Sequence, residues 1–111
     1  MTTETYERGR ILQVLADNEG ISSAVGMNLL LRTLDNLGVS LSIRELALRL
    51  EYLAQKGYVE LRRREDIPGW DRTRKGAGRP KDVMSARLTA KGLDLVQGSL
   101  VPDPGVAFEV A

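Results

Sequence analysis

The chain has 111 residues, of which 42% are hydrophobic and 28% charged, and its formal net charge is +1. This length supports one domain around a single core. The sequence contains no cysteine and no histidine, which excludes disulfides, Cys/His metal sites and catalysis by imidazole. No apolar run reaches the roughly 18 residues that a membrane span needs. We therefore expect a cytoplasmic protein with no cofactor, no metal and no membrane contact.

Apolar residues at helical spacing predict two helices in the first part of the chain. The first begins at a cap on Thr3 or Thr5. The second lies within 24–37, where leucines recur at three- and four-residue spacing, and Ser23 or Asn28 could cap it.

A third helix is predicted from about 42 to 56. Ser42 and Glu45 have the spacing of a capping box, and Gly57 ends the helix. The short turn between the second and third helices predicts a helix-turn-helix at 28–56. The residues expected on the core side of the third helix are Ile43, Leu46, Ala47, Leu50, Leu53 and Ala54.

Beyond Gly57 the pattern changes to the alternation typical of strands. We expect inward side chains at Val59, Leu61, Met84, Ala86 and Leu88, and outward ones at Tyr58, Glu60, Arg62, Arg64, Ser85 and Arg87. A long loop at about 66–81, rich in Pro and Gly, joins the two strands. Thr89 then caps a fourth helix.

Together these elements predict a mainly α fold with a small β-hairpin (α+β), in the order of a winged helix-turn-helix. The domain would comprise residues 1–98, with the wing at 58–88 and the last helix at 89–98. Residues 99–111 would form an extended C-terminal tail.

Positive charge is concentrated in the predicted wing. Residues 61–81 contain eight Arg or Lys and three Asp or Glu, while the remainder has eight basic and twelve acidic residues. This asymmetry is typical of a surface that meets a polyanion, although a basic loop can also serve only solubility. The basic candidates for double-stranded DNA binding are Arg62, Arg64, Arg72, Arg74, Lys75, Arg79 and Lys81. Within them, Gly78-Arg79-Pro80-Lys81 is similar to the core of an AT-hook, which lies in the minor groove.

The outward side of the third helix admits two interpretations. Arg44 and Arg49 could contact DNA in a major groove, with Glu45 and Glu51 opposing them. Leu48 and Tyr52 lie four residues apart on the same side. An exposed apolar pair of that kind often marks a contact with a protein partner.

Catalysis is not expected. The aspartates fall at predicted helix ends, loops and caps, where backbone geometry favours this residue, and no spacing groups them into a metal site or an acid/base pair.

The sequence resembles a family of small winged-helix proteins of Mu-like phages and prophages. The resemblance covers about residues 6–106 and is carried by Leu50-x-x-Leu53-Ala54-x-x-Gly57-Tyr58-Val59, by Leu88-Thr89-x-x-Gly92-Leu93-Asp94-Leu95-Val96-x-Gly98 and by Pro104-Gly105-Val106. The sequence departs from that family in its long arginine-rich wing and in Ala107-Phe108-Glu109, where the family has a basic ending. The resemblance implies a phage context and DNA binding.

We therefore expect a non-enzymatic, homodimeric DNA-binding protein, a phage or prophage transcriptional regulator or DNA-associated factor. The alternative is a protein-interaction module that binds a phage or host protein through Leu48, Tyr52 and the tail. RNA binding by the same wing is a third, minor alternative.

Overall fold

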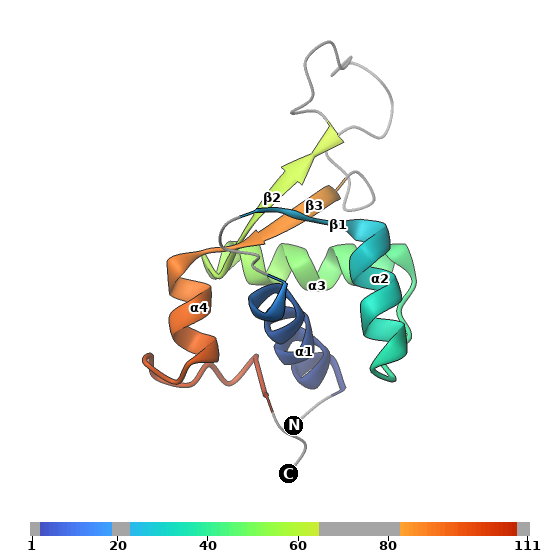
Figure 1. The fold of residues 1–111 in the computed structure, drawn as a ribbon. Helices are drawn as coiled ribbons and strands as arrows, with labels where there is room; N and C mark the ends of the chain where they lie inside the picture. Colours follow the sequence, from blue (N-terminus) through green and yellow to red (C-terminus); the bar gives the residue numbers. More distant parts are fainter. Residues whose placement is uncertain (1–2, 19–22, 65–82, 109–111) are drawn as a thin grey trace.

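The computed structural model describes residues 3–18, 23–64 and 83–108 and has an α+β fold (Figure 1). In chain order its elements are α1 (Thr3–Asp17), β1 (Val25–Gly26), α2 (Met27–Asn36), α3 (Ile43–Gln55), β2 (Val59–Arg63), β3 (Val83–Leu88) and α4 (Ala90–Val96). These described residues form four helices and one three-stranded antiparallel sheet, an arrangement compatible with a winged-helix-like fold.

The sheet has the order β1–β3–β2, so β3 is its central strand. Val25 of β1 is paired with Ala86 of β3, and Val59 of β2 is paired with Leu88. The sequence analysis did not predict β1, because a strand of two residues is too short to show alternation. By pairing with β3, β1 holds the start of α2 beside the β2–β3 hairpin (Figure 1).

The core lies between the helices and the inner side of the sheet. Within the described part of the chain, its largest fully buried side chains are Ile11, Leu12, Leu15, Leu30, Leu34, Leu46, Leu50, Leu53 and Leu88. The predicted core side of α3 is confirmed at Leu46, Ala47, Leu50 and Leu53 and is wrong at Ile43, which is 46% exposed. Ile43 is the first residue of α3, so it lies at the edge of the core.

Two predicted helix caps are confirmed and one is wrong. The Ser42 hydroxyl accepts the Glu45 N–H (3.1 Å) while the Ser42 N–H donates to the Glu45 carboxylate (2.9 Å), which completes the capping box. The Thr89 hydroxyl accepts the Gly92 N–H (3.0 Å) at the start of α4. In contrast, α2 begins after Gly26 and has no side-chain cap, so neither Ser23 nor Asn28 caps it.

Two predicted side-chain directions in the hairpin are also wrong. The pairing of β2 with β3 shifts between Arg62 and Arg63, and the irregularity leaves Met84 exposed while Val83 is buried. Tyr58 precedes β2 and is buried in the core, and its hydroxyl donates to the Asp103 carboxylate (2.8 Å). The alternation of inward and outward side chains therefore does not extend to Tyr58 or to Met84.

The tail packs on its own chain. The Ala107 N–H donates to the Thr5 carbonyl oxygen (3.1 Å) and the Arg8 guanidinium donates to the Gly105 carbonyl oxygen (3.2 Å), while Val106 is buried. Residues 99–108 thereby return from α4 to α1 (Figure 1). None of the helices in the described ranges is long and apolar enough to cross a bilayer.

Candidate nucleic-acid interface

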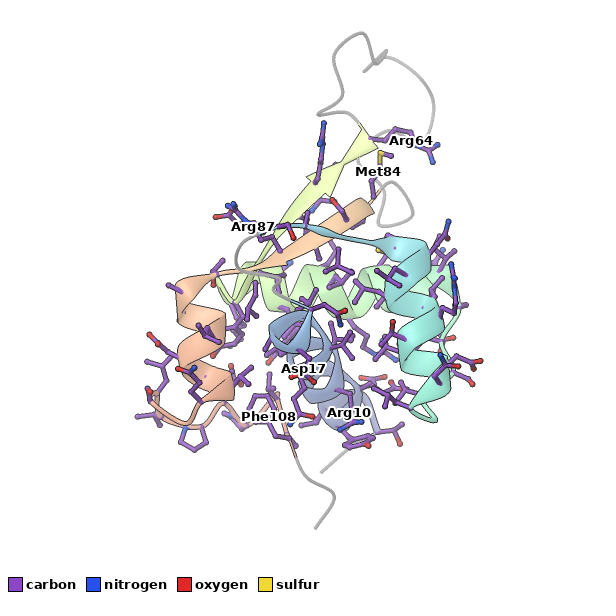
Figure 2. The ribbon with its side chains drawn as sticks, viewed as in Figure 1. Arg10, Asp17, Arg64, Met84, Arg87 and Phe108 are labelled. Atoms are coloured by element: carbon purple, nitrogen blue, oxygen red, sulfur yellow. The ribbon has the colours of Figure 1, made fainter. Side chains whose placement is uncertain are left out.

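The β2–β3 hairpin extends past the helices at one end of the molecule (Figure 1). Figure 2 shows Arg64 and Met84 at that end, whereas Arg10 and Phe108 lie at the opposite end. The arginine-rich run that begins at Arg62 therefore starts on the part of the molecule that projects from the helical body.

The four arginines in the described part of the hairpin have different surroundings. Arg62 and Arg64 are exposed, as predicted. Arg63 is half-buried and forms an ion pair with Glu51 of α3. Arg87 of β3 pairs with Glu60, its neighbour across the hairpin. The other predicted DNA-binding residues of the wing lie outside the described residues; these are Arg72, Arg74, Lys75, Arg79 and Lys81, together with the sequence similar to an AT-hook.

The predicted outward position of Arg49 is wrong. Its guanidinium lies 3.2 Å from the Glu7 carboxylate and 3.8 Å from that of Glu4, both on α1. Only 13% of the Arg49 side chain is exposed. A projection of α3 alone could not place Arg49, because the covering carboxylates come from a helix more than forty residues away in sequence. Arg49 joins α1 to α3 and does not face solvent with Arg44, which is exposed.

Tyr52 is not a free partner for Leu48 on the outer side of α3. The guanidinium carbon of Arg8 lies 3.7 Å from the centre of the Tyr52 ring, and the Lys56 ammonium lies 5.7 Å from it. The tail also covers Tyr52, because Gly105 lies so close to the Tyr52 hydroxyl that a Cβ added to Gly105 would overlap this hydroxyl. Leu48 remains 41% exposed, so the predicted apolar pair is reduced to one exposed side chain.

The two acids of α3 expected to oppose a polyanion are both engaged. The Ser42 backbone N–H, and to a smaller extent the Ser42 hydroxyl, hold the pKa of Glu45 below its usual value. This carboxylate is therefore ionised and bound at the helix start. Glu51 is paired with Arg63. The charge of Glu51 is therefore compensated by an arginine of the protein itself, whereas Glu45 stays an ionised, exposed carboxylate at the start of α3.

Asp103 and Tyr58 form a polar contact that the sequence did not reveal. Burial raises the pKa of Asp103, but hydrogen bonds from the Gly105 N–H and the Tyr58 hydroxyl outweigh burial and leave that pKa below its usual value. Burial and the Asp103 hydrogen bond raise the pKa of Tyr58 to about 12. The only signal in the sequence was the turn-forming Asp103-Pro104-Gly105, which gives no hint of Tyr58 as a partner.

Shallow hollows flank the described part of the hairpin. One, of about 280 Å³, lies between the starts of α2 and α3 and the hairpin, and its lining includes Leu29, Ile43, Arg64 and Met84. Another, of about 360 Å³, is lined by Ser23, Ala24, Glu60, Leu61, Arg62 and Arg87. The hollow of about 280 Å³ brings together three exposed apolar side chains, Leu29, Ile43 and Met84. The sequence analysis did not predict this, since it placed Ile43 and Met84 in the core.

The described residues contain no group of three or more acidic side chains that could hold a metal ion. No protein-family model, curated protein or solved structure matches the chain at a significant level. The class of the molecule is thus given by its own geometry: an α+β fold with a projecting hairpin that carries exposed arginines.

Proposed function

We propose that this chain is a non-enzymatic winged helix-turn-helix protein that binds double-stranded DNA. In this proposal α3 lies in or near a major groove, and the wing (residues 58–88) follows the backbone or the minor groove. The order of helices and strands and the central position of β3 in the sheet support the winged-helix assignment.

The observation that carries the proposal is the place of the basic charge. Arg62 and Arg64 are exposed on the projecting hairpin, and they lead directly into a segment with five further basic residues. Cationic side chains on a protruding element can reach phosphates without moving the core, and the release of counterions supplies affinity.

The surroundings of α3 support a role beside the wing. Arg44 is exposed on the outer side of the helix, and the Glu51 carboxylate of the same helix is paired with Arg63. A carboxylate paired with an arginine repels a phosphate backbone less than a free one does. Arg49, in contrast, belongs to the contact with α1 and not to the interface.

We further propose a homodimer in a bacterial cytoplasm, acting as a phage or prophage transcriptional regulator or DNA-associated factor. The phage context comes from the resemblance of the sequence to small winged-helix proteins of Mu-like phages. A twofold dimer would place two copies of α3 on successive turns of DNA and double the number of phosphate contacts. The mass of the protein in solution, measured by light scattering, tests the dimer.

A mobility-shift assay across a series of salt concentrations tests DNA binding. We expect a shift at low salt that weakens steeply as salt rises. Replacement of Arg72, Arg74, Lys75 and Arg79 together by alanine should lower the salt slope by about 0.9 for each phosphate that is no longer neutralised. The control is Arg10→Ala, which removes one arginine at the end opposite the hairpin and should leave the slope unchanged. Absence of any shift at low salt would contradict the proposal.

The alternative, a protein-interaction module, is less favoured by the described residues. It relied on Leu48, Tyr52 and the tail, yet Tyr52 is covered by Arg8 and residues 103–108 pack on the same chain. A complex with a phage or host protein that forms without DNA, and that a Leu48→Asp variant abolishes, would restore it.

A further inference from the structure

One row of side chains runs along the outer side of α3. Arg44, Leu48 and Gln55 point away from the buried positions Leu46 and Leu50, and all three are exposed. Leu48 is the apolar member of this row. Leu48 has a basic neighbour, Arg44, one turn before it. One turn after it, Tyr52 is covered by Arg8 and the tail, and Glu51 is paired with Arg63.

The size of the exposed apolar area on this row decides between two kinds of partner. A stable protein interface buries on the order of 800 Å² on each side and has an apolar centre of several side chains. A single half-exposed leucine between polar residues does not supply that centre. Base reading in a major groove needs much less, because one apolar side chain can contact the 5-methyl group of one thymine.

We propose that Leu48 contacts the 5-methyl group of a thymine while Arg44 donates to the O6 and N7 atoms of a guanine nearby. This inference rests on the proposed DNA binding and adds the base specificity of α3. Residues four apart on a helix are separated by about 6 Å along its axis. Bases are stacked about 3.4 Å apart along one strand. The thymine and the guanine should therefore be about two base-pair steps apart.

Gln55 lies outside this pair of contacts. It follows Arg44 by eleven residues, which corresponds to about 16 Å along the helix axis. A straight helix leaves a curved groove over such a distance, so Gln55 would face the backbone. The specificity therefore belongs to the first half of α3, where the Ser42–Glu45 capping box fixes the helix start.

The experiment uses the full chain and a duplex obtained by selecting tight binders from a random pool. Each thymine of the selected site is replaced in turn by deoxyuridine, which lacks only the 5-methyl group. We expect one position at which this change weakens binding about fourfold, the loss for one apolar carbon that is no longer buried. That position should lie about two steps from a guanine whose replacement weakens binding about tenfold in the parent and has little effect in Arg44→Ala.

Three variants assign the methyl contact to a side chain. Leu48→Ala should bind the thymine and deoxyuridine duplexes equally. Leu37→Ala is the matched control, because Leu37 is 46% exposed but follows the C-terminal end of α2, and it should keep the fourfold difference. Ile43→Ala should keep it too, because Ile43 lines the hollow beside the hairpin. Thermal unfolding of the variants checks that each remains folded.

The outcomes separate this inference from the proposed function. DNA binding without sensitivity to any thymine methyl group overturns the inference alone, as does a sensitivity that survives in Leu48→Ala or disappears in Ile43→Ala. If the chain forms a complex with another protein, and Leu48→Ala loses that complex but keeps the sensitivity to the methyl group, the inference is also overturned. Absence of DNA binding at low salt overturns both the inference and the proposed function.

Discussion

Gly92 is the residue at which α4 comes closest to the start of the hairpin. A Cβ at this position would overlap the Tyr58 carbonyl oxygen and lie 2.8 Å from Cδ1 of Leu88. The carbonyl oxygen cannot move away freely, because it accepts the Thr89 N–H (3.0 Å). The chain therefore needs a residue without a side chain here, although α4 is a regular helix.

Gly92→Ser should lower the free energy of unfolding by about 1–3 kcal/mol, the usual cost of overpacking. The same substitution at Gly26 is the matched control. No atom lies within 4 Å of a Cβ at Gly26, and this residue precedes α2 with φ −67°, where serine can act as a cap. Gly26→Ser should raise the free energy of unfolding by about 0.5 kcal/mol. Urea titration measures both values, and similar destabilisation by both substitutions would contradict this account.

The contact between α1 and α3 shows how an element determines the role of a charged residue. On sequence spacing alone, Arg49 belonged with Arg44 as a candidate for DNA binding. The Glu7 carboxylate instead lies 3.2 Å from Arg49, and both side chains are mostly buried. The pair therefore holds α1 against α3. Removal of the Arg49 side chain would leave the Glu7 carboxylate without its cation.

Arg49→Ala should lower the free energy of unfolding by about 2 kcal/mol, between the values for exposed and for fully buried pairs. It should leave the salt slope of DNA binding unchanged. Arg44→Ala should do the opposite, with stability within about 0.5 kcal/mol of the parent and weaker DNA binding. Chemical unfolding and the mobility shift, measured on both variants, test the assignment. A reduced salt slope in Arg49→Ala would indicate that Arg49 contacts DNA and would contradict the assignment.

The helices were predictable because their signals are local. Leucines at three- and four-residue spacing and the Ser42–Glu45 capping box specify α3 within a few turns of chain. The exposure of Arg62 in β2 and of Arg64 just after it was predictable for the same reason, since burial alternates regularly along 59–64.

The remaining features depend on contacts between distant segments. Met84 is exposed because β3 shifts its register against β2, and Tyr58 is buried in the core, with its hydroxyl bonded to Asp103 of the tail. Arg49 is covered by α1. No window of neighbouring residues contains these partners, so the candidate site was predicted at the hairpin and only in part on α3.

At the scale of the whole molecule, the tail connects elements that are far apart in the sequence. Asp103 accepts hydrogen bonds from the Tyr58 hydroxyl (2.8 Å) and the Gly105 N–H (2.7 Å), and residues 105 and 107 bond to α1. A Cβ at Gly9 would overlap the Ala107 carbonyl oxygen, so α1 itself has a position shaped for the tail. The stability of the domain should therefore depend on the ionisation of Asp103.

The pKa of Asp103 is lowered in the folded protein from its ordinary value of 3.8, so its stabilising effect is present above that pH and disappears as pH falls through the lower folded value. Asp103→Asn should therefore be less stable than the parent by about 1 kcal/mol at neutral pH. The difference should shrink below pH 4. Urea unfolding of both proteins between pH 2 and 7 measures it, and a difference that does not change with pH would contradict the role of the carboxylate.

Glu51 and Arg63 join the outer side of α3 to β2, and each side chain is about one quarter exposed. Together with the shared core, in which Leu53 of α3 and Val59 of β2 are buried, this contact holds the helix and the hairpin in one relative orientation. For a protein that binds DNA as proposed, the major-groove contact and the wing contact then have one fixed helical phase. A base pair inserted between them would rotate one contact by about 34–36° relative to the other. Strict spacing within the operator would follow from this fixed orientation.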